Sequence, residues 1–296
     1  MSEKIIVMSS AGGPTAAACT AGALKAIAEH PAALEIVAGS GVSGAAAPMF
    51  GAAVGKTSDE ITGAVGEMNS DELFSPSNNV LEGLFDCGVG LTGLYRGVRY
   101  RRFLEKHLGD LLLADAKFDV SIPAFNLHEG AVVHFNRTEW PRVGGARACR
   151  ASAAVPLVFE AESTVDPDNP QHHYVDAGLH EPLDISPMAS GEWTRCIVII
   201  NDLVRLKPDP NLMNRKATFF WIALRCLADS YADRLVDTIK EVQSVCAATG
   251  KQVQLMYAPT SINFFEFTSA QMKQATEHAR ERCLWLLDNP TRSGSL

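Results

Sequence analysis

A serine stands in residues 41–45 (GVSGA), directly after a run of strand-forming residues and before an alanine-rich stretch. A serine on a sharp strand-to-helix turn projects from the sheet, and the next backbone N–H and the helix N-terminus face it. The segment departs from the pattern GxSxG at its last position, where Ala45 replaces glycine. Ser43 is therefore a candidate nucleophile, and an ordinary tight turn is the alternative.

Two consecutive glycines occur in residues 10–15 (SAGGPT), after the first expected strand and at the start of a helix. Glycines in this position leave backbone N–H groups free to bind a negative oxygen, either of a phosphate or of an oxyanion. The segment matches neither GxxxxGK[ST] nor GxGxxG, so it does not indicate nucleotide binding. It is either an anion-binding loop or an ordinary glycine-rich turn.

An aspartate ends a short apolar strand in residues 174–178 (YVDAG). Small residues beside a carboxylate let it approach a partner with little water between them, and partial desolvation raises its basicity. Asp176 is therefore a candidate general base, and an aspartate that caps a turn is the alternative.

In order and spacing these three segments resemble the patatin-like phospholipase family, which has a glycine-rich loop, a GxSxG serine and a DGG or DGA aspartate. Residues 150–159 (RASAAVPLVF) and 21–27 (AGALKAI) are similar to two further family segments. The resemblance is clearest over residues 5–187. We expect one patatin-like domain over residues 1–296, with 188–296 as its divergent C-terminal part.

The resemblance implies a serine acyl hydrolase that cleaves lipid-like carboxylic esters, as a phospholipase A, a lysophospholipase or an esterase. Ser43 would attack the carbonyl carbon and Asp176 would take its proton. Backbone N–H groups of Gly12 and Gly13, helped by Gly44, would stabilise the oxyanion, and water would release the acid. The scheme requires no cofactor and no metal.

The glycine loop departs from the family pattern GGGxRG. An ungapped alignment gives residues 12–17 (GGPTAA), which lack the arginine and the last glycine. In that register Pro14 replaces the third glycine, and one oxyanion donor is lost because proline has no N–H. In a second register Gly13 takes that place, one residue is inserted after it, and the oxyanion hole is complete. The sequence leaves both registers open.

Other functions fit parts of the same pattern. An acyltransferase or thioesterase would use the same two residues, and a weakly active or non-catalytic binding protein would explain the altered glycine loop. An α/β-hydrolase would need a histidine base, for which His180 and His278 are available. Lipid-like substrates and peripheral membrane contact are the expected partners, and aromatic groups such as residues 264–267 (FFEF) are more often core than membrane anchors.

A metal site is the remaining alternative. Five possible ligands crowd into ten residues: His172, His173, Asp176, His180 and Glu181. Their spacing matches no zinc pattern such as HExxH, and adjacent residues of a strand point to opposite faces. We therefore interpret them as a histidine-rich surface loop and expect no metal.

Strand-like and helix-like segments alternate along the chain and must position these residues. We expect strands at residues 4–9, 34–38, 118–125, 131–136, 173–175, 195–200 and 253–258. We expect helices at residues 16–29, 44–55, 57–68, 98–108, 144–153, 216–248 and 269–288, and a turn-rich loop or lid at 69–97. This alternation predicts an α/β fold, a three-layer α/β/α domain with a mostly parallel central sheet.

Composition narrows the class of protein. The 296 residues include 26 Lys and Arg against 34 Asp and Glu, a net charge of −8 without basic runs, which argues against nucleic-acid binding. The 7 cysteines show no CxxC spacing, which favours a reducing compartment over a disulfide framework.

Residues 36–55 are uncharged but rich in glycine, so we interpret them as strand, turn and helix. With a strand expected at the N-terminus, we expect a soluble, cytoplasmic protein.

Overall fold

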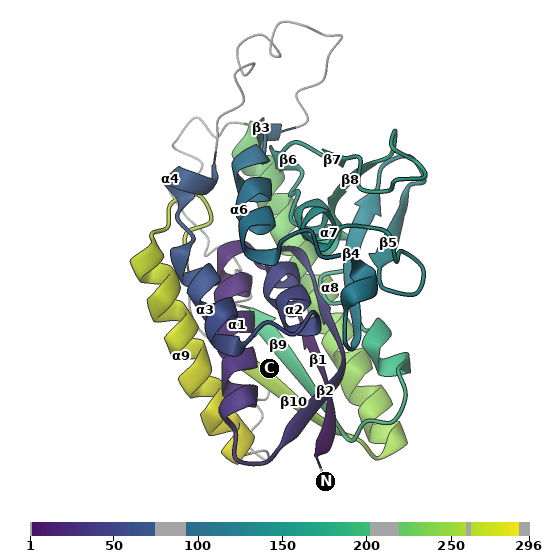
Figure 1. Ribbon diagram of the computed structural model, residues 1–296, viewed down its shortest axis with the longest axis vertical. Coiled ribbons are helices and arrows are strands. Elements are labelled where there is room, and N and C mark those ends of the chain that lie inside the picture. The colour runs from purple at the N-terminus through teal and green to yellow at the C-terminus, as the bar shows by residue number, and fades with distance from the viewer. Residues whose placement is uncertain (1, 75–92, 202–218, 259–261, 290–296) are drawn as a thin grey trace, which may run out of the picture.

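One large sheet lies between two layers of helices (Figure 1). The computed structural model describes residues 2–74, 93–201, 219–258 and 262–289. Within them, the three-layer α/β/α fold with a mostly parallel sheet that the sequence predicts is confirmed.

The large sheet has eight strands within the described residues. They are β1 (Glu3–Ser9), β2 (Leu34–Gly41), β4 (Asp119–Asn126), β5 (Ala131–Phe135), β7 (Glu162–Ser163), β8 (His173–Asp176), β9 (Arg195–Asn201) and β10 (Gln252–Ala258). Their order is β10-β9-β1-β2-β4-β8-β7, with β5 also paired to β4. Neighbours from β10 to β4 are parallel, whereas β5, β8 and β7 join antiparallel. A separate parallel pair joins β3 (Gly93–Tyr95) to β6 (Leu157–Phe159).

The helices surround this sheet. They are α1 (Gly13–Glu29), α2 (Ala46–Ala53), α3 (Ser58–Glu67), α4 (Ser70–Leu73), α6 (Val98–Leu108), α7 (Gly145–Ser152), α8 (Phe219–Thr249) and α9 (Ser269–Asp288). Short 3-10 turns are η1 (Ser43–Ala45), η2 (Leu113–Asp115), η3 (Ala177–Leu179) and η4 (Ser186–Ala189).

Most predicted elements are present at nearly the predicted bounds, and α6 and α9 begin and end at the predicted residues. The expected helix at 44–55 is η1 followed by α2, so residues 36–55 form strand, turn and helix as predicted. The sequence does not predict the short strands β6 and β7, nor α4 and β3, which lie inside the expected loop at 69–97. Of the expected loop at 69–97, residues 75–92 lie outside the described residues.

Among the described helices, none combines the length and the apolar character needed to span a membrane.

The two faces of β1 build two hydrophobic cores. Ile5 and Val7 belong to the core under α1, α2, α3, α6 and α9, whereas Ile6 and Met8 belong to the core under α8. This division follows from the alternation of side chains along a strand. α8 contributes the buried side chains of Leu235, Ile239, Val242 and Cys246 to the second core.

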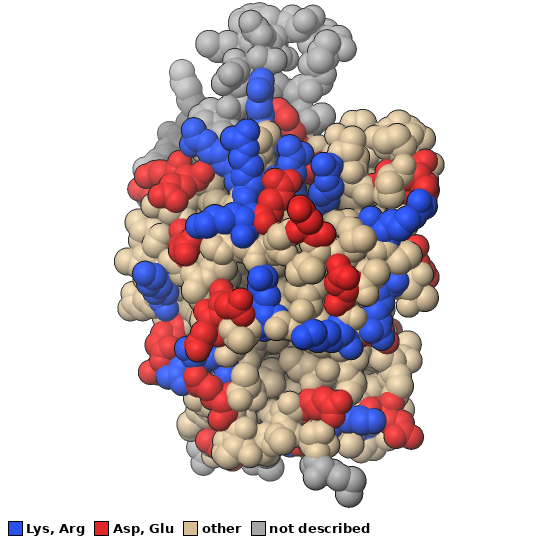
Figure 2. Space-filling model, in the orientation of Figure 1, with Lys and Arg blue, Asp and Glu red and all other residues tan. Residues whose placement is uncertain are grey.

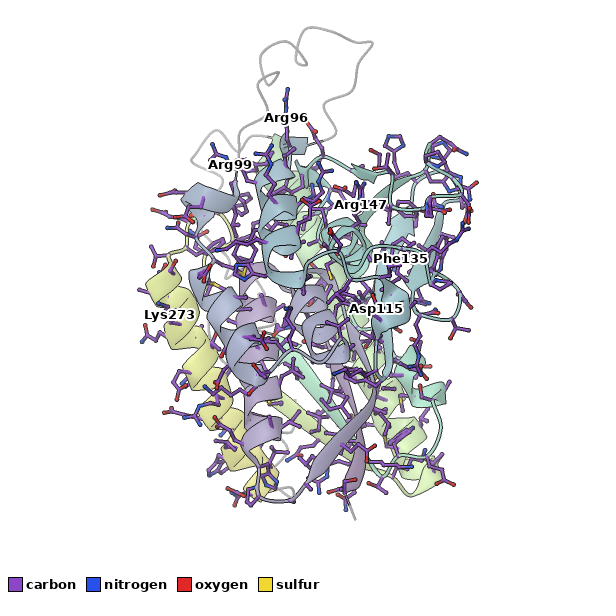
Figure 3. The ribbon with its side chains drawn as sticks, viewed as in Figure 1. Arg96, Arg99, Asp115, Phe135, Arg147 and Lys273 are labelled. Atoms are coloured by element: carbon purple, nitrogen blue, oxygen red, sulfur yellow. The ribbon has the colours of Figure 1, made fainter. Side chains whose placement is uncertain are left out.

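Basic side chains gather over α6 on the face drawn in Figure 2. Arg96, Arg99 and Arg102 are exposed there. Figure 3 shows Arg96 and Arg99 pointing outward near the N-terminal end of α6, and the Nη1 of Arg99 donates a hydrogen bond of 3.3 Å to the carbonyl oxygen of Asp71 in α4. This end of the molecule therefore carries a local positive charge although the chain is acidic.

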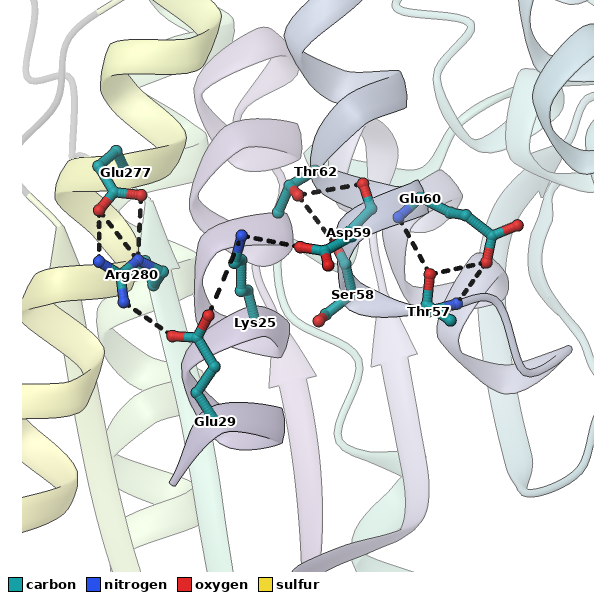
Figure 4. Close-up of polar contacts among 9 residues, drawn as sticks. All are labelled: Lys25, Glu29, Thr57, Ser58, Asp59, Glu60, Thr62, Glu277 and Arg280. Atoms are coloured by element: carbon teal, nitrogen blue, oxygen red, sulfur yellow. Dashed lines mark hydrogen bonds and ion pairs between the residues drawn. The ribbon is translucent and has the colours of Figure 1, made fainter. Parts of the chain in front are cut away.

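Polar contacts fix α3 and α9 against α1 (Figure 4). Thr57 and Glu60 form a capping box at the start of α3: the Glu60 backbone N–H donates to Thr57 Oγ1 (3.2 Å) and the Thr57 N–H donates to Glu60 Oε2 (2.7 Å). Lys25 Nζ of α1 donates a hydrogen bond of 2.9 Å to Asp59 Oδ1 of α3. Arg280 Nη1 of α9 donates one of 2.7 Å to Oε2 of Glu29, the last residue of α1. α1, which carries the glycine loop at its N-terminus, is thus held on both sides.

Candidate active site

Ser43 lies on a sharp turn between β2 and η1. Its φ is +57°, a left-handed conformation that a residue with a Cβ adopts rarely and at an energetic cost. The Ser43 backbone N–H donates a hydrogen bond of 2.9 Å to Oγ of Ser152 in α7, and the Ala45 N–H donates one of 3.1 Å to the Val42 carbonyl oxygen. These bonds stabilise a strand-to-helix elbow of the kind that presents a nucleophilic serine.

Gly44 contacts the backbone of the glycine loop. A Cβ on Gly44 would lie 1.9 Å from the carbonyl oxygen of Gly13, so this approach is possible only for glycine. Gly13 has a φ of +57°, and a Cβ there would lie 2.6 Å from ring carbons of Phe264. The serine turn and the glycine loop, separate in sequence, therefore meet through their backbones.

Hydrogen bonds from three other segments hold the glycine loop. The Asn201 side chain donates from Nδ2 to the Ser10 carbonyl oxygen (2.6 Å), and the Asn201 backbone N–H donates to Ser10 Oγ (3.1 Å). The Ala11 N–H donates to the Pro182 carbonyl oxygen at 2.9 Å, and the Tyr231 hydroxyl donates to the Ala11 carbonyl oxygen at 2.5 Å. The end of β9, the segment after β8, and α8 together fix the loop.

The N-terminus of α1 lies at this loop. The first N–H groups of an α-helix have no partner within the helix, and they carry partial positive charge. Pro14 stands in the first turn of α1, where its missing N–H removes no hydrogen bond. Gly13, not Pro14, is the residue whose backbone meets Gly44. Gly12 and Gly13 keep their N–H groups at the point where the helix faces the Ser43 turn.

Asp176 is the last residue of β8 and is only 4% exposed. Burial raises the pKa of its carboxyl from 3.8 to about 6, although hydrogen bonds from the Ser43 hydroxyl and the Gly178 N–H lower it in part. The Gly178 N–H donates to Asp176 Oδ1 at 2.7 Å, and the Asp176 N–H donates to the Ala154 carbonyl oxygen at 3.0 Å. The carboxyl group is thus fixed beside the serine hydroxyl and ionised at neutral pH.

A small apolar pocket of about 30 Å³ lies at Ser43. Besides Gly13, Pro14, Ser43 and Gly44, its described lining is Met68, Leu73, Phe74, Tyr100, Ala153, Val155, Phe159, Phe264 and Phe267. A second cavity, of about 410 Å³, lies among residues of α2, α3 and α6 and shares Gly44, Met68 and Tyr100 with the first. An apolar chain attached at Ser43 would therefore meet apolar walls.

The fold brings the predicted site residues together and leaves the alternative bases elsewhere. Ser43, Asp176, Gly12, Gly13 and Gly44 meet where β2, β8 and α1 end or begin. His180 stacks on Phe125 with 4.2 Å between ring centroids, and His278 is exposed on α9. No histidine is among the described residues that line the pocket at Ser43.

The sequence does not predict two residues that hold the site in place, Ser152 and Asn201. Ser152 lies 109 residues from Ser43, and Asn201 lies 191 residues from Ser10, so neither hydrogen bond can be read from local spacing. A weak signal exists for Asn201, a polar residue at the carboxyl end of a buried parallel strand, where binding sites form.

The histidine-rich segment does not assemble as one group. His172 contacts Asn126 at 3.2 Å, and His173 and His180 are exposed. Instead, within the described residues, the structure groups Glu181 with Asp184 and with His134 of β5, a histidine that sequence reasoning did not connect with them.

Comparison with known proteins gives a family match and structural likenesses. A family model described as patatin-like phospholipase matches residues 8–189. The structure of VipD from Legionella pneumophila superposes with a TM-score of 0.58 at 12% identity, covering 97% of this chain and 67% of that one.

Two further structures match less closely. Human GIVD cytosolic phospholipase A2 in complex with methyl gamma-linolenyl fluorophosphonate gives a TM-score of 0.42 at 9% identity, covering 98% of this chain and 59% of that one. The type III effector protein ExoU gives 0.41 at 14% identity, covering 97% and 53%. This chain thus spans about half to two thirds of the length of these structures. No curated protein matches it.

Proposed function

Because this chain belongs to the patatin-like phospholipase family, we propose that it is a serine acyl hydrolase that cleaves lipid-like carboxylic esters through an acyl-enzyme on Ser43. Membership in the family supports a lipid acyl hydrolase in general. The observation that carries the specific proposal is the pairing of Ser43, at a φ of +57°, with a buried carboxyl group whose pKa is about 6.

In the proposed reaction, Asp176 acts as the general base. The Ser43 hydroxyl loses its proton to the Asp176 carboxylate while its oxygen attacks the carbonyl carbon of the ester. The tetrahedral intermediate collapses, the alcohol leaves with the proton from Asp176, and Ser43 stays acylated. Water then attacks the acyl-enzyme while Asp176 accepts one of its protons, and Asp176 returns this proton to the Ser43 oxygen as the fatty acid leaves. A base with a pKa near 6 is ionised at neutral pH and still a useful proton acceptor.

The oxyanion would lie at the N-terminus of α1. The backbone N–H groups of Gly12 and Gly13 lie at the start of this helix, and Gly44 follows the nucleophile. The Ser43 N–H is occupied by Ser152 and is not a candidate donor. The positive end of the helix would add to the stabilisation of the developing negative charge.

The walls around Ser43 support a lipid-like substrate. The acyl chain would run from the apolar pocket into the cavity of about 410 Å³ that shares Gly44, Met68 and Tyr100 with it. The exposed arginines near the N-terminal end of α6 (Figures 2 and 3), including Arg96 and Arg99, are suited to an anionic lipid surface. We therefore propose that the protein contacts anionic membranes peripherally at this end.

Labelling with a fluorophosphonate tests the nucleophile. Intact-protein mass spectrometry should show one adduct, which peptide mapping assigns to Ser43 and which the Ser43→Ala variant lacks. Turnover of a lysophospholipid should be lost in the same variant, with its Tm close to that of the wild type. Absence of an adduct on the wild-type protein, or an adduct that persists in Ser43→Ala, would overturn the assignment.

A further inference from the structure

A buried carboxylate oxygen of Asp184, in the segment after η3, has no hydrogen-bond partner among the described residues. Asp184 is 0% exposed, and its Oδ1 accepts a hydrogen bond of 2.8 Å from the Ser186 N–H. Its Oδ2 is buried and has no hydrogen-bond donor among the described residues. A buried polar oxygen without a hydrogen-bond partner is costly, so Asp184 Oδ2 is a candidate ligand for a cation.

Two further metal-ligating side chains converge on this oxygen. His134 Nε2 lies 2.8 Å from Glu181 Oε2, and one ligand atom from each of His134, Glu181 and Asp184 lies within 4.8 Å of the others. Within the parts of the chain that the structure describes, no other group of three such side chains meets this condition.

The surroundings of the cluster leave room for a hydrated ion. A cavity of about 300 Å³ borders His134 and is lined by polar residues that include Ser121, Asn136 and Ser186. The Ser121 Oγ is itself buried without a partner among the described residues. Of the three side chains only His134 lines this cavity, so water from it would reach a bound cation on the His134 side.

We propose that His134, Glu181 and Asp184 form a binding site for a divalent cation of the Zn²⁺ or Mn²⁺ class, separate from the acyl-transfer residues. One imidazole and two carboxylates suit these ions better than Ca²⁺, which takes six to eight oxygen ligands. The site would join β5 to the segment after β8. That segment contains Pro182, whose carbonyl oxygen accepts the Ala11 N–H of the glycine loop. The cation would thus brace the loop from outside without taking part in the reaction.

Cation binding to the whole chain tests this proposal without reference to activity. The protein is treated with EDTA, exchanged into metal-free buffer and titrated with ZnCl2 or MnCl2 by calorimetry, and its Tm is followed in parallel. We expect one cation per chain and a rise of several degrees in Tm at saturation. His134→Gln should lose both effects, and His173→Gln, which changes an exposed histidine of β8, should keep them.

Co²⁺ spectroscopy separates this site from thiol ligands, since the chain has 7 cysteines. Oxygen and nitrogen ligands give visible bands without the sulfur-to-cobalt charge transfer of cysteine sites. Absence of stoichiometric binding, binding that persists in His134→Gln, or a charge-transfer band for the bound Co²⁺ would each overturn the proposal. Because Asp184→Asn alters a buried group, Glu181→Gln is the second variant, and it should also lose the Tm shift.

Discussion

The backbone N–H of Ser43 is bound to the hydroxyl oxygen of Ser152 at 2.9 Å. Both residues are buried, and the bond connects the turn after β2 to the last residue of α7. The Ser43 N–H therefore has a partner inside the protein, and in the proposed reaction the oxyanion donors are the N–H groups of Gly12, Gly13 and Gly44. The elbow is therefore held by the protein and not by what binds to it.

Replacing Ser152 with alanine should loosen this elbow. The Ser43 N–H would lose its acceptor in a buried position, which costs about 1–3 kcal/mol. We expect a lower urea midpoint and a fall in kcat of about tenfold or more, because the Ser43 oxygen is no longer held in line with its base. Ser163→Ala, a half-buried serine of β7, is the matched control. Equal stability and rates in the two variants would contradict this role.

The pH dependence of the reaction should follow Asp176. Burial raises its pKa to about 6, and only the ionised form accepts the serine proton. The rate kcat/KM on a neutral ester should therefore rise with pH between about 5 and 7 and then level off. Asp176→Asn should remove both the turnover and this profile. A rate that does not change across this range would show that another group limits the reaction.

The same pKa shift predicts an effect on stability. The folded state holds its proton up to about pH 6, whereas the unfolded chain releases it near 3.8, so the free energy of unfolding falls as pH rises through this window. The loss is about 3 kcal/mol, at about 1.4 kcal/mol per pKa unit. Asp176→Asn removes the buried charge and should be more stable than the wild type at pH 8, with a smaller gain at pH 4. Urea unfolding at both pH values measures the difference.

Gly44→Ala should be inactive and strongly destabilised. The added Cβ would lie 1.9 Å from the Gly13 carbonyl oxygen, so the serine turn and the glycine loop must move apart. Gly63 on α3 offers a matched control, since nothing lies within 4 Å of a Cβ at that position. Gly63→Ala should fold normally and gain up to about 1 kcal/mol from helix propensity. Folded, active Gly44→Ala protein would show that this contact is not required.

The length of the acyl chain should be set by the cavity among α2, α3 and α6. Ala64 lines this cavity and is half-buried. Ala64→Trp should fill part of it, so that KM rises for long-chain esters and stays unchanged for acetyl esters. A series of p-nitrophenyl esters from two to sixteen carbons gives the profile. An equal effect on all chain lengths would place the acyl chain elsewhere.

The sequence predicts the fold well because its signals are local. The continuous apolar run of β1 is typical of a strand that is buried on both faces, and in the structure Ile5 and Ile6 belong to different cores. The motifs around Ser43 and Asp176 likewise lie within single turns. Short strands such as β6, at residues 157–159, carry too few residues to show a period.

What the sequence does not predict is the set of contacts between distant turns. The partner of Ser43 lies in α7, and the anchor of Ser10 lies at the end of β9. The proposed cation site joins His134 to Glu181, which are 47 positions apart, so spacing within the histidine-rich segment does not reveal it. The backbone contact between Gly13 and Gly44 likewise joins two turns that are far apart in sequence.

Asn201 lies beyond residue 189, where the match to the family model ends, yet it holds the glycine loop inside that match. The segment that matches the family model is therefore shorter than the segment that the fold requires. A protein trimmed at the homology boundary would lose β9 and expose the edge of β1, a bare strand prone to pair with other chains. For this protein, the limits of a stable fragment are set by the sheet and not by the extent of recognisable ancestry.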